Sequence, residues 1–124
     1  MVNRNTMKEK YSSKPQTFNV SRVKTYKKNG WYIGVAKEIK THSESTYRII
    51  FEVTDKKGNK YKNASFWLPK VVSEDDSLLD GFWNTYGDMP SENDIVNKKV
   101  NVYIEKTKGN DGMIYHNVVD MKKI

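Results

Sequence analysis

Aromatic and lysine side chains alternate in residues 56–70, "KKGNKYKNASFWLPK", with no acidic residue among them. Aromatic rings stack on the flat faces of unpaired bases, and ammonium groups neutralise the phosphates of the same strand. The combination therefore indicates a surface that binds single-stranded nucleic acid. The residues of this run expected to contact it are Lys56, Lys57, Lys60, Tyr61, Lys62 and Trp67.

Alternation of side chains along a strand predicts which of these rings face outward. Phe66 and Leu68 belong to the apolar row of this stretch, so Trp67 and Tyr61 are expected on the outer surface. Lys62 falls on the inward row. We therefore expect it at the end of the strand, where its long side chain reaches solvent.

The same reasoning applies to the other aromatic residues. Trp31 and Val35 share a row that is expected to face the core, which sends Tyr32 outward. Tyr103 is also expected outward, and Tyr115 is ambiguous because both rows of its stretch are mixed. Tyr32 and Tyr103 are therefore further candidates for stacking on a base.

No residue pattern indicates catalysis. His42 and His116 are the only histidines, and neither has a partner in a local motif. The chain has no cysteine, which excludes disulfides and thiolate metal sites. The acidic residues of 73–94 do not have the spacing of a calcium loop, and the first of them suit the start of a helix. We expect a protein that is not an enzyme and that uses no metal or cofactor.

Charge is segregated along the chain. Residues 1–28 hold eight Lys or Arg and one acid, which equals the formal net charge of +7 for all 124 residues. Residues 73–94 hold seven acids and no base. This separation favours a polyanion partner for the basic segments. No apolar run is long enough for a signal peptide or a membrane span, so we expect a cytoplasmic protein without membrane contact.

The beginning of the chain differs from the rest. Residues 1–16 are polar and are expected to form a flexible basic arm, and residues 17–124 are expected to form one domain. Asn29 and Gly30 together predict a type I′ hairpin turn, because both central positions of that turn need positive φ. This leaves room for an extra strand at the N-terminal side of the turn.

Turn and periodicity signals predict five main strands and one helix. The helix is expected to begin after Ser73 and to end at Gly87, between the third and fourth strands. This order predicts an all-β OB-fold, a five-stranded Greek-key barrel. Another small barrel, or an open antiparallel sheet with a helix laid on it, is the alternative. The expected strands are 31–40, 46–54, 60–69, 98–106 and 113–123. In the second of them, alternation predicts that Tyr47, Ile49, Phe51 and Val53 face inward.

The string "GWYIGVAKEIK…TYRIIFEVTDKKGNKYKNASFWLPK", followed by an acidic helix and "KKVNVYIEK…GMIYHNVV", resembles the small OB-fold single-stranded DNA-binding proteins of bacteriophages and mobile elements of Gram-positive bacteria. The resemblance implies a non-catalytic role in DNA replication or recombination, in a bacterial or phage-infected cell. It implies a binding groove formed by Arg48, Tyr61, Lys62 and Trp67. The resemblance also implies that two loops, His42–Ser45 and Lys106–Asn110, take part in the binding groove. The second loop contributes the cations Lys106 and Lys108.

Two other functions stay open from the sequence. A protein-interaction module would use the acidic residues 73–94 to dock on a host factor or a replication protein. An RNA-binding OB domain would use the same rings and cations as a DNA binder, and only the 2′-hydroxyl would distinguish its ligand. Formation of an oligomer is compatible with each of these functions.

Overall fold

The alternating stretch in the middle of the chain forms the strand β2 (Thr46–Thr54), with Ile49, Phe51 and Val53 buried on one side, as predicted. It belongs to a computed structural model that describes residues 17–124. The expected flexible arm, residues 1–16, lies outside the described residues. Tyr47, in the same row, is at the beginning of the strand and stays partly exposed.

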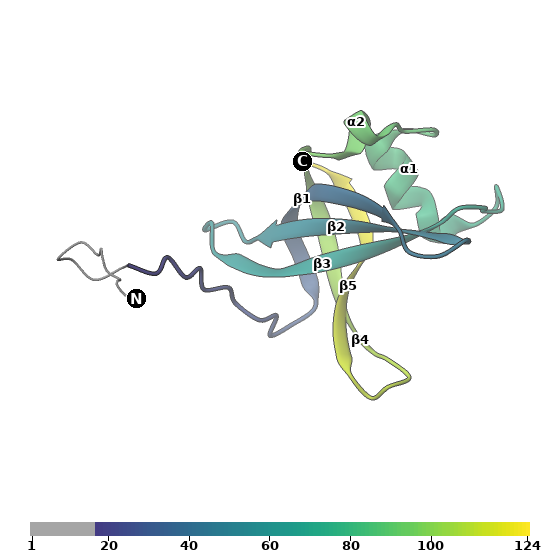
Figure 1. The fold of residues 1–124 in the computed structure, drawn as a ribbon. Coiled ribbons are helices and arrows are strands. Elements are labelled where there is room, and N and C mark those ends of the chain that lie inside the picture. Colours follow the sequence, from purple (N-terminus) through teal and green to yellow (C-terminus); the bar gives the residue numbers. More distant parts are fainter. Residues whose placement is uncertain (1–16) are drawn as a thin grey trace, which may run out of the picture.

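Five strands close into a barrel in the order β1-β2-β3-β5-β4 (Figure 1). All neighbouring pairs are antiparallel except β3 and β5, which run parallel and meet at Ser65 and Asn117. The helical segment lies between β3 and β4, so the predicted OB-fold class is confirmed and the open sheet is excluded. The bounds are β1 Gly30–Thr41, β3 Lys60–Pro69, η1 Ser77–Leu79, α1 Asp80–Tyr86, α2 Glu92–Ile95, β4 Lys99–Lys108 and β5 Ile114–Lys123.

The helical segment closes one end of the barrel. Phe82 of α1 stacks on Phe66 of β3, with ring centroids 5.4 Å apart. The helix does not begin directly after Ser73, so that prediction is wrong. A 3₁₀ turn comes first, and the carboxylate of Asp76 accepts a hydrogen bond from the backbone N–H of Leu78 in this turn. Gly87, at φ 101°, ends α1 as predicted. No helix within residues 17–124 is long and apolar enough to cross a membrane.

The predicted orientation of β1 is wrong. Gly34 and Ala36 are buried, so the row that contains Tyr32 faces inward and Trp31 lies on the outer surface, 43% exposed. At Gly34, β1 approaches β4 so closely that an added Cβ would lie 2.8 Å from a Val102 methyl group. Only glycine fits there without displacing that side chain. The small residues therefore mark the inner row of β1, although the larger apolar residues suggested the other row.

A β-bulge changes the orientation of the first residues of β3. Phe51 pairs with Ala64 and Val53 pairs with Tyr61, so two steps on β2 correspond to three on β3. The extra residue reverses the alternation. Tyr61 consequently packs against the core, and Lys62 is exposed. The predicted outward orientation of Tyr61 and inward orientation of Lys62 are both wrong for this reason.

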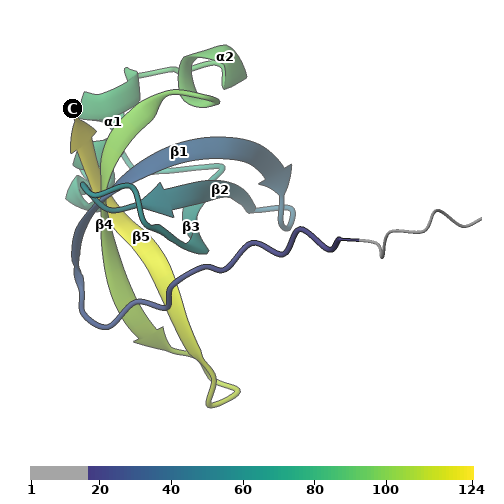
Figure 2. The same cartoon turned by 90° about the vertical axis from the view of Figure 1, so that its left-hand side faces the viewer.

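Residues 17–29, here called the strap, cross the end of the barrel opposite the helices (Figure 2). The predicted type I′ hairpin is wrong, because Asn97 is the only described non-glycine residue with positive φ. A hairpin would also need a free edge of β1, and both edges are paired in the closed barrel. Instead of the extra strand, the strap makes one parallel bridge between Lys24 and Tyr61.

Candidate nucleic-acid interface

Trp67 lies on the outer surface of β3, as predicted, and is 38% exposed. Its indole Nε1 donates a hydrogen bond of 3.2 Å to Oδ1 of Asn117 on the neighbouring strand β5. The ring of His42, in the loop between β1 and β2, meets the indole edge-on at a centroid distance of 4.7 Å. These contacts fix the plane of the indole while leaving part of its surface open to solvent.

Arg48 is the cation of this site. It pairs with Trp67 across the β2–β3 ladder, and its guanidinium carbon lies 5.3 Å from the centre of the indole ring. Its Nε donates a hydrogen bond of 2.8 Å to Oγ of Ser65, which is itself buried. A guanidinium held by one N–H keeps its other donors for a ligand such as phosphate.

A groove surrounds these two residues and is here called the Trp67 groove. Its volume is about 340 Å³, near the lower end of the roughly 300–1,000 Å³ that ligand sites occupy. Of the described residues that line it, none is acidic. Its lining consists of Tyr26, Arg48, Lys62, Asn63, Ser65, Trp67, Ile114, Tyr115, His116 and Asn117.

Tyr32 and Tyr61 do not lie beside Trp67. Both turn inward at the end of the barrel crossed by the strap, where their rings meet edge-on at 5.1 Å. Tyr32 donates a hydrogen bond of 3.0 Å to the carbonyl of Lys28, and Tyr61 donates one of 3.2 Å to the carboxylate of Asp55. Their rings therefore pack against the core at this end of the barrel.

Tyr26 is the residue that sequence reasoning missed. It is 7% exposed and inserts from the strap into the barrel end, where it stacks on Tyr61 at 5.3 Å and lies 4.9 Å from the ring of His116. Its hydroxyl donates to the carbonyl of Lys62. Burial is the main cause that raises the pKa of Tyr26, followed by the nearby hydroxyls of Tyr32 and Tyr61. The signal was present, because Tyr26 is flanked by lysines in "VKTYKK", as Tyr61 is.

The lysines of the β2–β3 turn lie at the same barrel end. Asp55 holds this turn by accepting hydrogen bonds from the backbone N–H groups of Lys57 and Asn59, at 2.9 and 3.0 Å. These bonds, with that from the Asn59 side chain as the largest contribution, lower the pKa of Asp55. The side chains of Lys56, Lys57 and Lys60 are exposed around the turn.

His116 lies near two of the predicted phosphate contacts, Lys62 and Lys106. Burial lowers its pKa most, and the positive charges of Lys106 and Lys62 lower it further. The imidazole is therefore neutral at neutral pH. Lys106 pairs with His116 across β4 and β5, so the predicted cation of the second loop lies beside the groove.

The last two predicted residues, Tyr103 and Lys108, are both on β4. Tyr103 is on the outer face of β4, where its ring meets that of Trp31 edge-on at 5.3 Å. The ammonium of Lys122 lies 4.4 Å from the centre of the Trp31 ring. Lys108 is at the end of β4, next to the β4–β5 turn. Trp31 and Tyr103 thus form a second aromatic surface on another side of the barrel.

The chain matches no protein-family model, and no curated protein matches it in sequence.

Proposed function

We propose that this protein binds single-stranded DNA without catalysing a reaction, and that it serves replication or recombination of a phage or mobile element in the bacterial cytoplasm. The observation that carries the proposal is the pair formed by Trp67 and Arg48, a partly exposed ring with a cation over it, in a groove whose described lining residues include no acid. Stacking and charge neutralisation are the two interactions that hold single strands without reading their sequence.

In this proposal, each of the main residues of the Trp67 groove has its own role. A base stacks on the exposed part of the Trp67 indole, whose plane is fixed by Asn117 and His42. A phosphate of the same strand lies at Arg48, and Lys62 supplies a second positive charge on the lining of the groove. Because any base offers a flat face and any nucleotide a phosphate, binding tolerates changes of sequence.

A fluorescence titration tests the proposal. The unmodified protein is titrated with a single-stranded DNA, the corresponding duplex and an RNA of the same sequence, each at two salt concentrations. We expect quenching of tryptophan fluorescence by single-stranded DNA, and a slope of log affinity against log salt of about −0.7 for each phosphate neutralised. Equal or tighter binding of RNA would assign the groove to RNA, and absence of binding to any single strand would overturn the proposal.

A further inference from the structure

The strap is held in place by backbone hydrogen bonds as well as by Tyr26. The N–H of Lys24 donates to the carbonyl of Lys60 at 2.8 Å, and the N–H of Lys62 donates to the carbonyl of Lys24 at 3.0 Å. At the other end of the strap, Oδ1 of Asn29 accepts a hydrogen bond of 2.9 Å from the backbone N–H of Lys106. The strap backbone is therefore anchored at Lys24 and at Asn29, on either side of Lys27 and Lys28 in the sequence.

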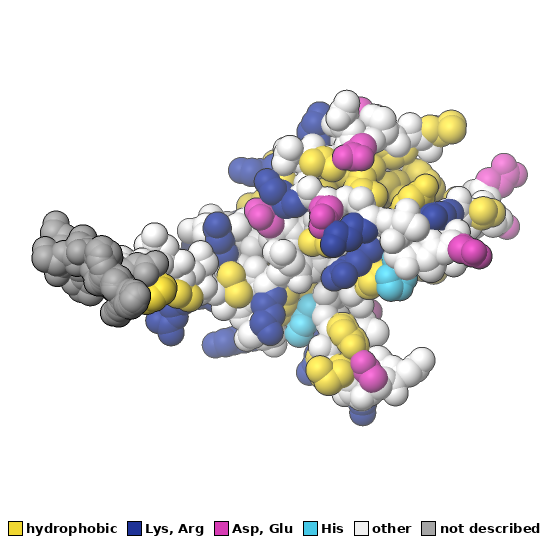
Figure 3. All heavy atoms as spheres, viewed as in Figure 1, with side chains coloured by type: hydrophobic (Ala, Val, Ile, Leu, Met, Phe, Trp, Pro, Cys, Tyr) yellow, Lys and Arg dark blue, Asp and Glu magenta, His cyan; other side chains and the backbone are white. Residues whose placement is uncertain are grey.

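A second hollow adjoins the Trp67 groove along the strap. The two share Tyr26, Ile114 and His116 as lining residues, so they are adjacent. The second hollow adds the cations Lys27, Lys28 and Lys106, and none of its described lining residues is acidic. In Figure 3, dark-blue side chains gather over the strap and the strands beside it.

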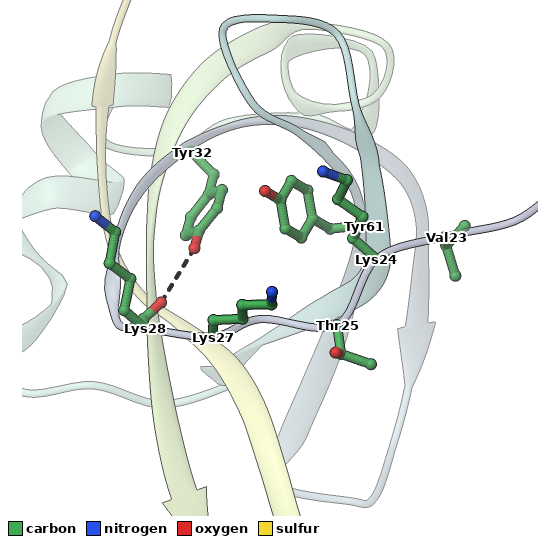
Figure 4. A pocket seen from close by; sticks show the side chains of 7 residues that line it. All are labelled: Val23, Lys24, Thr25, Lys27, Lys28, Tyr32 and Tyr61. Atoms are coloured by element: carbon green, nitrogen blue, oxygen red, sulfur yellow. Dashed lines mark hydrogen bonds between the residues drawn. The ribbon is translucent and has the colours of Figure 1, made fainter.

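A third hollow continues the same path to the far side of the strap. It shares Lys27 and Lys28 with the second hollow and adds Lys24. Figure 4 shows the side chains of Lys24 and Lys27 beside the space that Tyr32 and Tyr61 border. Among the described residues, the only ion pair is that of Lys40 with Glu38, which is elsewhere in the structure.

We propose that the strap is a second phosphate-binding element, over which a DNA strand continues from the Trp67 groove past His116 to Lys27 and Lys28. This inference rests on the proposed function of the Trp67 groove. An anchored strap presents its cations without first having to become ordered, which lowers the entropic cost of binding. The position of His116 agrees with this path, because it lines both hollows and pairs with Lys106 across β4 and β5.

Paired double variants and oligonucleotides of increasing length test the inference. The strap variant is Lys27→Ala with Lys28→Ala, and the control is Lys98→Ala with Lys99→Ala. All four side chains are exposed, so both variants keep the core and change the net charge equally. Lys99 begins β4, roughly 20 Å along the strand from Lys106. Oligo-dT of about 4 to about 16 nucleotides covers the lengths that single OB domains bind.

The length dependence distinguishes the two binding elements. For the shortest oligonucleotide that binds, we expect equal affinities of the strap and control variants. For the longest, the strap variant should bind more weakly than the control, with a salt slope smaller in magnitude by about 1.4, or about 0.7 for each lost phosphate contact. Lys106 also lines the second hollow, so Lys106→Ala should likewise reduce the magnitude of the salt slope.

Each outcome bears on one of the two proposals. Equal affinities and equal salt slopes of the strap and control variants at every length, with tight binding by the unmodified protein, would overturn the role of the strap alone. The Trp67 groove would then be the whole site. Failure of the unmodified protein to bind an oligonucleotide of any length would overturn both proposals.

Discussion

Arg48 and Trp67 face each other across the β2–β3 ladder, with the guanidinium carbon 5.3 Å from the centre of the indole ring. Strand pairing sets this distance, because directly opposite side chains on one face of a sheet are neighbours. Under the proposed function, a base stacks on the ring and a phosphate of the same strand contacts the guanidinium.

Replacement of Trp67 by alanine should weaken binding of oligo-dT by ~1–3 kcal/mol, because a stacked base loses its platform. Trp31→Ala is the matched control, since Trp31 is comparably exposed and lies on another side of the barrel. Fluorescence anisotropy of a labelled oligonucleotide measures both affinities. An equal loss in the two variants would show that Trp67 is not the specific stacking residue.

Replacement of Arg48 by lysine should weaken binding although the charge is retained. Arginine holds Ser65 through Nε and keeps further N–H groups for phosphate, and lysine has no equivalent planar arrangement. Arg48→Ala should in addition reduce the salt slope by about 0.7, the contribution of one phosphate. Titrations at several salt concentrations measure these changes, and an unchanged slope in Arg48→Ala would contradict a phosphate contact at this residue.

Tyr26 should stabilise the fold through its ring more than through its hydroxyl. Tyr26→Phe removes one hydrogen bond to the carbonyl of Lys62 and should lower the free energy of unfolding by about 1 kcal/mol. Tyr26→Ala also leaves a cavity at the barrel end and should cost ~3–5 kcal/mol. Urea unfolding measures both. The control is Tyr103→Phe, whose hydroxyl makes no hydrogen bond with the described residues, and a loss as large in the control would argue against a docked strap.

Replacement of Gly81 by alanine should destabilise the protein even though alanine favours helices by about 1 kcal/mol. An added Cβ would lie 1.9 Å from a carboxylate oxygen of Asp120 and 2.8 Å from the backbone carbonyl of Met121. The Asp120 side chain can move, but the backbone of β5 cannot without disturbing the barrel. Thermal unfolding should show a lower midpoint for Gly81→Ala and little change for Asn84→Ala, on the exposed side of α1. A higher midpoint for Gly81→Ala would refute the close packing.

Binding of DNA should raise the pKa of His116. In the free protein, burial and then Lys106 and Lys62 hold this pKa below 6.5, and Tyr26 is the third group that faces the imidazole. Bound phosphates would offset the two cations, so the complex takes up a proton between the two pKa values. Affinity should therefore rise as the pH falls through that interval, whose lower limit, the pKa of the free protein, lies below 6.5.

Nuclear magnetic resonance of the imidazole protons measures the pKa of His116 in both states. In His116→Gln, this contribution to the pH dependence of affinity should disappear. An identical pKa in the free protein and in the complex would mean that no phosphate comes near His116, and that the strand leaves the Trp67 groove in another direction.

The orientation of the aromatic residues shows how far a sequence can be interpreted without coordinates. Trp67 was correctly expected on the surface, because the row of β3 next to it is unbroken and apolar around Phe66. Tyr61 lies in the same strand, but the bulge between these residues reverses the alternation. A bulge adds one residue without a compositional signal. A prediction from strict alternation therefore assigns the wrong orientation to every residue between the bulge and the end of the strand.

The sequence by itself determined the order of the elements and the inner row of β2. These depend on local alternation and on the positions of turns, both of which are present in short windows of sequence. The tertiary structure alone decided that Tyr26, Tyr32 and Tyr61 gather at one barrel end and that Trp31 faces outward. The reason is closure of the barrel. Pairing of β3 with β5 and of β1 with β4 fixes which side of each strand faces inward. The barrel end that no helix covers is filled by large rings from the strap and from the strand ends.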